Sequence, residues 1–337
     1  MKTRARLAIL FILHSLIAVA QECHNSPWMS FISDSRTVAS LSIPGAHDAA
    51  TGEGMCIIAG FGKTQVLDIS SLWECGVRAF DLRPAMDNGK LHIYHGPVKT
   101  KISFQEALEI ISAKLEQQPS EFAIVLLRNE GKACDEWKEA IGKAIAALND
   151  KAAMFSPTMK MADVRGKILF LSRDEYSGCN RGAMIKGWSH SHDGTTSAEI
   201  VPYNNGTAAH LNVQDYYDTT GKNGLELKSN AATRFIELAG SAPDGCWTIN
   251  FLSAYRTTWL GFTPFATSAG YKRNASAVNR EIAEMLAQRT ADNKKATGII
   301  FIDYAGIDKA PGGIWHWREF HTHGKQLVQI IIEQNFR

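Results

Sequence analysis

The feature that most restricts the fold is an alternation of apolar runs of strand length with segments of helical periodicity. Several runs are unbroken stretches of Val, Ile, Leu and Phe, which is typical of strands buried on both faces of a parallel sheet. Eight such runs are present, at residues 37–43, 77–82, 91–94, 122–127, 167–172, 210–214, 247–252 and 298–303. The alternation predicts an α/β fold.

Helices are expected between most of these runs. Ser103-Phe104-Gln105-Glu106 is a capping box that opens an amphipathic stretch. Helical spacing of apolar residues predicts further helices near 137–148, 225–239, 278–287 and 326–333. The link between the second and third runs is too short for a helix, although a barrel can lose one. No linker rich in Pro, Gly or Ser divides the chain, so we expect a single (β/α)8-like barrel.

The first 20 residues have the pattern of a cleaved export signal. A basic segment precedes a mostly apolar stretch at 7–20, and Ala18-Val19-Ala20 fits a cleavage site. We therefore expect a secreted or periplasmic protein whose mature part, residues 21–337, is one catalytic domain. A formal net charge of +2 provides no electrostatic footprint for nucleic acid, which is not an expected partner.

The cysteines agree with export. None of the six belongs to a CxxC pair, so disulfides in an oxidising compartment are expected rather than zinc or redox motifs. Sequence leaves the pairing open for Cys23, Cys56, Cys75, Cys134, Cys179 and Cys246. Asn205 and Asn274 begin glycosylation sequons, which matter only in a eukaryotic source.

Polar or ionisable residues follow almost every predicted strand. Because parallel strands of a barrel end at one mouth, these side chains are expected to converge there. They are His47, Asp48, Asp81, Arg83, His95, Arg128, Glu130, Arg173, Asp174, Asp215, Tyr217, Ser253, Tyr255, Asp303 and Tyr304. For Arg128 and Glu130 a solvated ion pair at the rim is an equal alternative.

His47 and His95 lie on either side of Arg83 in the sequence. Two imidazoles and a guanidinium are what acid–base cleavage of a phosphodiester needs: one imidazole accepts a proton, the other donates one, and the guanidinium holds the phosphate. The alternative is that each histidine is a structural residue.

Three motifs together resemble the X domain of bacterial phosphatidylinositol-specific phospholipase C. They are Ile-Pro-Gly-Ala-His47-Asp48, Gly76-Val-Arg-Ala-Phe-Asp81-Leu-Arg83 and Tyr94-His95-Gly96. The resemblance continues through shorter motifs to Ile302-Asp303-Tyr304. It implies a distorted, incompletely closed (β/α)8 barrel.

The resemblance also implies a mechanism. His47 would be the general base on the inositol 2-hydroxyl, which attacks phosphorus, and His95 would be the general acid on the diacylglycerol oxygen. Arg83 would contact the phosphate. The products would be diacylglycerol and inositol 1,2-cyclic phosphate, and the substrate would be phosphatidylinositol or a GPI-type lipid.

Further roles follow from the same resemblance. Asp303 would orient His47, Asp81 would orient His95, and Asp48 would lie beside Arg83 and the leaving group. The residues expected to bind the inositol ring are Arg173, Asp215 and Tyr217, with Arg128 near the position of a lysine in the family.

A bound metal is not expected, because Arg83 places a cation where eukaryotic relatives hold calcium with acidic residues. No other cofactor is expected. A metal-dependent glycerophosphodiesterase-like enzyme is one alternative, and a catalytically inactive module that binds inositol lipids is another.

Two apolar segments, at 55–61 and 257–265, are expected at the rim of the barrel. Their large side chains could enter a lipid surface or pack inward as loop cores. The residues expected to touch the membrane are Trp259, Leu260, Phe262, Ile57 and Ile58. We expect a monomer that contacts the membrane peripherally.

Overall fold

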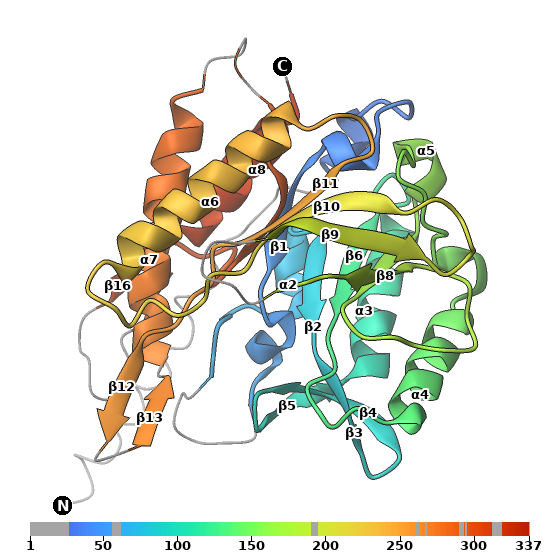
Figure 1. The fold of residues 1–337 in the computed structure, drawn as a ribbon, viewed down its shortest axis with the longest axis horizontal. Coiled ribbons are helices and arrows are strands. Elements are labelled where there is room, and N and C mark those ends of the chain that lie inside the picture. Colours follow the sequence, from blue (N-terminus) through green and yellow to red (C-terminus); the bar gives the residue numbers. More distant parts are fainter. Residues whose placement is uncertain are drawn as a thin grey trace, which may run out of the picture.

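The computed structural model describes residues 27–55, 62–189, 195–260, 263–266, 268–289, 293, 295–311 and 319–336. The expected export signal therefore lies outside the described residues. Nine strands form a closed barrel in the order β1-β14-β11-β10-β9-β8-β7-β6-β2 (Figure 1). Their bounds are Ser42–Ala46 (β1), Ala79–Leu82 (β2), Ala123–Leu127 (β6), Ile168–Ser172 (β7), Ala183–Lys186 (β8), Thr195–Pro202 (β9), Ala209–Gln214 (β10), Trp247–Phe251 (β11) and Gly298–Ile302 (β14).

The barrel is distorted, as expected, but the incomplete closure is wrong. β1 pairs in parallel with both β14 and β2, which closes the ring. The distortion comes from β9, which runs antiparallel to its neighbours β8 and β10. Neither β8 nor β9 was predicted, because their polar and small residues lack the continuous apolar pattern of the other strands.

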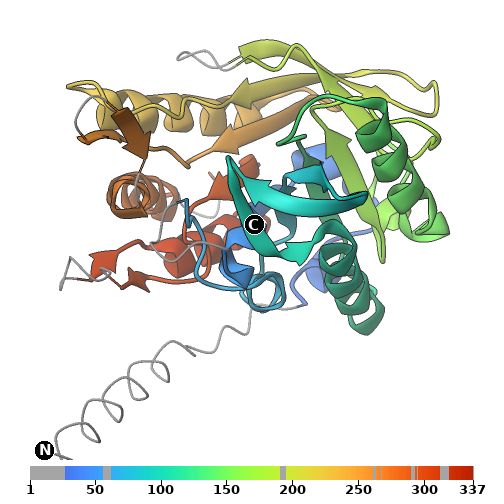
Figure 2. The same ribbon diagram turned by 90° about the horizontal axis from the view of Figure 1, so that it is seen from below.

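The run at 91–94 is a strand, but its assignment to the barrel is wrong. It lies in β4 (Lys90–His95), which pairs antiparallel with β3 (Pro84–Asp87) and β5 (Val98–Ser103) in a separate sheet. A two-residue turn joins β3 and β4, and this length suits an antiparallel hairpin rather than a parallel crossover. In Figure 2 this small sheet lies in front of one end of the barrel.

The predicted helices are all present and cover the outside of the barrel. Ser103 caps α3 through the capping box with Glu106. In Figure 1, α6, α7 and α8 lie on one side and α3, α4 and α5 on the other. The helices are α2 (Ile69–Glu74), α3 (Phe104–Gln117), α4 (Asp135–Ala146), α5 (Met161–Val164), α6 (Gly224–Ser241), α7 (Ser268–Ala287) and α8 (Gly324–Glu333).

Short elements complete the described chain. Two-stranded sheets are formed by β12 (Thr257–Leu260) with β13 (Thr263–Ala266), and by β15 (Lys309–Ala310) with β16 (Phe320–His321). The 3-10 turns are η1 (Met29–Phe31), η2 (Val38–Ser40), η3 (Ala49–Glu53) and η4 (Asn149–Lys151). The first predicted run, 37–43, is therefore partly η2, and its strand extends to Ala46.

The expected disulfides are present only in part among the described cysteines. Cys75 is disulfide-bonded, whereas Cys134, Cys179 and Cys246 are free thiols. Of the two sequons, Asn205 is exposed, but Asn274 is 2% exposed within α7 and is closed to a glycan.

A close contact between α4 and the loop after β7 gives a test of the packing. Gly142 lies in α4, and a Cβ there would lie 1.6 Å from the carbonyl oxygen of Ser177. Gly142→Ala should therefore lower the free energy of unfolding by about 2 kcal/mol, although alanine favours helices in general. Gly240→Ala in α6, where the nearest atoms belong to the exposed Lys295 side chain, should change it by less than about 1 kcal/mol. Urea unfolding checks both, and equal effects would contradict the packing argument.

Candidate active site

His47 and Asp303 form a pair at the carboxyl ends of two neighbouring strands. β1 and β14 are paired in register, with Ala46 beside Ile302, so the next residue of each strand emerges at the same point. His47 Nδ1 lies 2.7 Å from Asp303 Oδ1. A carboxylate at Nδ1 favours the tautomer that carries its proton there, which leaves Nε2 free to accept a proton.

Asp48 stands between both histidines and Arg83. Its backbone is left-handed, with φ of 44°, a conformation that aspartate tolerates better than most residues. Its Oδ2 lies 3.0 Å from His47 Nε2 and 3.2 Å from His95 Nε2, and its Oδ1 lies 2.9 Å from Arg83 Nε. The turn after β1 thus places one carboxylate in contact with all three groups.

Arg83 follows β2 and binds two carboxylates. Its terminal nitrogen lies 2.9 Å from Asp81 Oδ2, opposite its contact with Asp48. The prediction that Asp81 orients His95 is wrong in this structure, because Asp81 is held by Arg83 and by the backbone N–H of Asp48. His95 instead contacts Asp48 through Nε2 and the carbonyl oxygen of Gly62 through Nδ1.

The antiparallel hairpin brings His95 to the barrel mouth. The N–H of Tyr94 donates to the carbonyl of Arg83 at 3.0 Å, so β4 is tied to the end of β2. The N–H of Gly96 donates to Glu130 Oε1 at 2.8 Å, which fixes the turn after β4. The His95 and His47 ring centroids are 6.2 Å apart.

Arg173 and Asp215 form another part of the active-site wall, and Trp188 contacts both of them. Arg173 lies 3.7 Å from Asp215 Oδ2, and its guanidinium stacks 4.1 Å from the centroid of a Trp188 ring. The Trp188 indole N–H also donates to Asp215 Oδ2 at 3.0 Å. Sequence reasoning missed Trp188, since the strand β8 that leads to it was not recognised.

A cavity of about 480 Å³ joins these groups. Tyr217 stacks on Tyr255 with ring centroids 5.6 Å apart and forms part of its outer wall. Tyr271 of α7, which sequence reasoning also missed and for which no motif gave a signal, packs against His95. The cavity is lined by His47, Arg83, His95, Arg128, Arg173, Asp215, Tyr217, Ser253, Ala254, Tyr255 and Tyr271.

Arg128 faces this cavity beside an acidic neighbour. Its Nε lies 3.7 Å from Glu130 Oε2, and its side chain is 36% exposed. Both alternatives from the sequence therefore hold in part, because Arg128 is in an ion pair and also lines the cavity. At this distance and exposure the pair contributes little to stability.

Burial controls the charges of the inner residues. Burial, followed by the nearby positive charge of Arg83, holds the pKa of His47 well below its usual value. Burial also raises the pKa of Asp48 to about 6, although Arg83 opposes the rise. His47 is therefore a neutral imidazole at neutral pH, with Nε2 directed toward Asp48.

The ligand atoms of His47, Asp48 and Asp81 lie within 4.8 Å of one another and could in principle gather a metal ion. Arg83 already contacts both carboxylates at 2.9 Å. A divalent cation between them would have to approach a fixed guanidinium, which Coulomb repulsion disfavours. The carboxylates of Asp48 and Asp81 therefore suit the guanidinium of Arg83 better than a metal ion.

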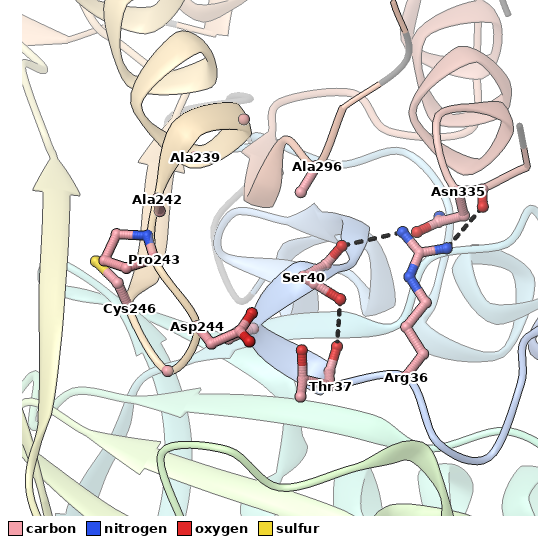
Figure 3. Close-up of a pocket in the computed structure, with 13 residues that line it drawn as sticks. Arg36, Thr37, Ser40, Ala239, Ala242, Pro243, Asp244, Cys246, Ala296 and Asn335 are labelled. Carbon is pink, nitrogen blue, oxygen red and sulfur yellow. Dashed lines mark hydrogen bonds between the residues drawn. The ribbon is translucent and has the colours of Figure 1, made fainter. Parts of the chain in front are cut away.

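Another cavity, of about 440 Å³, lies at the amino ends of the strands (Figure 3). Thr37 and Ser40 precede β1, Cys246 precedes β11, and Ala296 precedes β14. Arg36 there donates to the carbonyls of Ser40 and Asn335 and so braces the chain ends. This end of a barrel commonly serves stability rather than chemistry.

Only two of the five residues expected to touch a membrane are among the described residues. Trp259 and Leu260 are in β12, in a hairpin that projects from the barrel in Figure 1. Phe262, Ile57 and Ile58 lie outside the described residues.

Comparison with known proteins supports the resemblance in the motifs. Residues 42–174 match the family model described as phosphatidylinositol-specific phospholipase C, X domain. A 1-phosphatidylinositol phosphodiesterase of Listeria monocytogenes serovar 1/2a is 28% identical over 290 residues, which cover 82% of this chain and 80% of the relative. A 1-phosphatidylinositol phosphodiesterase of Staphylococcus aureus strain Newman is 27% identical over 295 residues, covering 83% and 88%.

Solved structures agree on the fold. A Staphylococcus aureus phosphatidylinositol-specific phospholipase C carrying pentafluoro-Phe has a TM-score of 0.70 at 22% identity, and the match covers 93% of this chain and 99% of that chain. The phosphatidylinositol-specific phospholipase C of Listeria monocytogenes has a TM-score of 0.66 at 25% identity, covering 92% and 98%. The predicted recognition and the α/β barrel are both confirmed.

The depressed basicity of His47 can be tested by NMR. We expect its ring carbon resonances to titrate well below pH 6.5, because burial and Arg83 disfavour the imidazolium. Arg83→Met should raise the pKa of His47, whereas Arg83→Lys, which keeps the charge, should leave it closer to that of the wild type. A wild-type His47 that titrates near pH 6.5 would contradict the electrostatic argument.

Proposed function

The chain carries a phosphatidylinositol-specific phospholipase C X domain over residues 42–174, and we propose on this premise that the protein is a bacterial-type phospholipase C that cleaves phosphatidylinositol. The observation that carries the proposal is the placement of His47 and His95 on either side of Asp48 and Arg83 at one mouth. The related 1-phosphatidylinositol phosphodiesterases support the substrate. GPI anchors contain the same inositol phosphodiester and belong to the proposed substrate class.

The proposed reaction is an attack by the inositol 2-hydroxyl on phosphorus. His47 Nε2 accepts the hydroxyl proton while the oxygen–phosphorus bond forms. The bond from phosphorus to the glycerol oxygen breaks, and His95 donates a proton to that oxygen. The products are diacylglycerol and inositol 1,2-cyclic phosphate, and both protons are accounted for by the two imidazoles.

The surrounding residues suit these steps. A low pKa leaves His47 unprotonated at neutral pH, as a base must be, and Asp303 holds the ring from behind. Arg83 presents a fixed charge that can stabilise the phosphate in the transition state. Asp48 Oδ2 lies 3.2 Å from His95 Nε2, so this carboxylate orients the ring that is proposed to donate the proton.

The inositol ring would bind against the part of the cavity wall that Arg173, Asp215 and Tyr217 form. Arg173 and Asp215 offer donors and acceptors for its hydroxyls, and the face of Tyr217 offers a stacking surface for its C–H side. Arg128 adds a guanidinium where it lines the cavity.

The lipid end of the substrate would face a membrane. Leu225 and Leu227 are exposed large side chains at the start of α6, the helix that follows β10. With Trp259 and Leu260 of β12 they would form a peripheral contact surface. Among the described residues, no helix combines the length and apolarity needed to cross a bilayer.

We further propose that residues 1–20 direct export and that the mature domain, from residue 21, acts as a monomer.

Phosphorus NMR of the reaction with phosphatidylinositol vesicles tests the chemistry. The wild type should form inositol 1,2-cyclic phosphate, and His47→Ala and His95→Ala should each lower kcat by about 10³-fold. His92→Ala, in the same strand as His95, is the control and should retain activity. Failure of the wild type to release diacylglycerol, or full activity in His47→Ala, would refute the assignment.

Chelation separates the proposed enzyme from a metal-dependent phosphodiesterase. EDTA should leave the rate unchanged, because Arg83 supplies the cation beside the phosphate. Arg83→Lys should lower kcat by about 10²-fold, since lysine cannot reproduce the forked contacts. Loss of activity with EDTA that a divalent ion restores would instead support the glycerophosphodiesterase-like alternative.

A further inference from the structure

A buried lysine in α6 takes no part in the proposed reaction, yet it is tied to the wall of the active site. Lys228 is 0% exposed. Its ammonium donates to the carbonyl oxygen of Tyr216 at 2.5 Å and to Gln214 Oε1 at 3.2 Å. Burying an ammonium is costly, so the contacts that it makes here have to offset that cost.

Gln214 extends the contact to the neighbouring strand. It ends β10, and its Oε1 also accepts from the N–H of Tyr216 at 2.6 Å. Its amide nitrogen donates to Asn250 Oδ1 and to the carbonyl of Phe251, each at 2.7 Å. Asn250 donates in turn to the carbonyl of Ala232 in α6 at 2.9 Å. We call this set the α6 clamp: Lys228, Gln214 and Asn250 with the three carbonyls.

The α6 clamp fixes the main chain on both sides of Asp215. The residue before Asp215 supplies the Gln214 side chain, and the residue after it has both its N–H and its carbonyl held. Asp215 can then meet Trp188 and Arg173, and Tyr217 can stack on Tyr255. Asp215 and Tyr217 are the residues proposed to bind the inositol ring.

We propose that Lys228 is a positioning residue for inositol recognition, which acts by holding the Gln214–Tyr216 turn so that Asp215 and Tyr217 face the cavity. The inference rests on the proposed function. Asp215 and Asp303 also act on this ammonium: burial lowers the pKa of Lys228 to about 7, and these two carboxylates oppose the fall. The hydrogen bonds of the clamp do not involve His47, Arg83 or His95, which lie on the turns after β1 and β2 and on β4. The charge of Lys228 also lowers the pKa of His47, but its contribution is smaller than those of burial, Arg83 and His95.

Lys228→Met tests the proposal with myo-inositol as a competitive inhibitor of phosphatidylinositol cleavage. We expect the Ki for myo-inositol and the KM to rise about tenfold, as for the loss of one well-placed polar contact, while kcat changes by less than about threefold. Lys228→Arg keeps a cation and its donors, and it should recover inositol binding to within about threefold of the wild type.

Lys272→Met is the matched control. Lys272 is 9% exposed, and its ammonium also donates to a main-chain carbonyl, that of Pro311. Both methionine variants should lower Tm, but only Lys228→Met should change the Ki for myo-inositol. Gln214→Met opens the same clamp from β10 and should raise the Ki as well, so it serves if Lys228→Met does not fold.

The outcomes separate the claims. A Lys228→Met or Gln214→Met protein that folds, has a lower Tm and binds myo-inositol like the wild type would overturn the positioning role. A wild type that neither binds myo-inositol nor cleaves phosphatidylinositol would instead refute the proposed function. A loss of kcat with unchanged KM in Lys228→Met would also overturn the inference, because it would place the effect on the chemical step.

Discussion

The mouth of this barrel depends on one buried guanidinium. Asp48, Asp81 and Asp303 are each nearly inaccessible to solvent, and three carboxylates in so small a volume would repel one another. Arg83 contacts Asp48 and Asp81 at 2.9 Å and supplies the compensating charge. A buried charge cluster of this kind is a poor source of stability, because desolvation consumes much of the Coulomb attraction. Its value lies in the geometry that it imposes on Asp48, which contacts both histidines.

The sequence predicted the apolar barrel strands well, but it predicted the less apolar strands and the contacts between site residues poorly. Seven of the eight expected runs are barrel strands, because strands buried on both faces carry an unbroken apolar signal. β8 and β9 have no such unbroken apolar run, so they were not predicted, and Trp188, which follows β8, was missed as a site residue. The sequence correctly predicted that His95 lies at the mouth, but for the wrong reason, because His95 belongs to an antiparallel hairpin and not to a barrel strand. The partner of His95 could not be found from spacing, because the left-handed turn at Asp48 decides which carboxylate reaches the ring.

The two ends of the barrel use buried charge differently. At the amino end, Arg78 and Glu121 form a fully buried pair at 2.8 Å, and Arg78 is also bonded to main-chain carbonyls. Each charge of this pair is compensated by the other, inside the protein and away from solvent. At the carboxyl end, one carboxylate oxygen of Asp48 lies 3.0 Å from His47 Nε2 and 3.2 Å from His95 Nε2, and both rings line a cavity. Buried charge is therefore fully enclosed at the amino end, whereas at the carboxyl end it adjoins a cavity.

The distortion of the barrel helps to position Arg173 and Asp215 at the active site. A regular parallel barrel would follow β7 with a helix and a parallel strand, whereas this chain inserts β8 and the antiparallel β9. The segment after β8 brings Trp188 to Arg173 and Asp215, where its ring stacks on the Arg173 guanidinium and its N–H donates to Asp215. On the other flank, α6 reaches the same Asp215 turn through a buried lysine. The Trp188 indole thus holds the Asp215 carboxylate directly, and the Lys228 ammonium holds its chain neighbours Gln214 and Tyr216. A turn held by two separate elements keeps its side chains in a more fixed geometry than a loop anchored at one end.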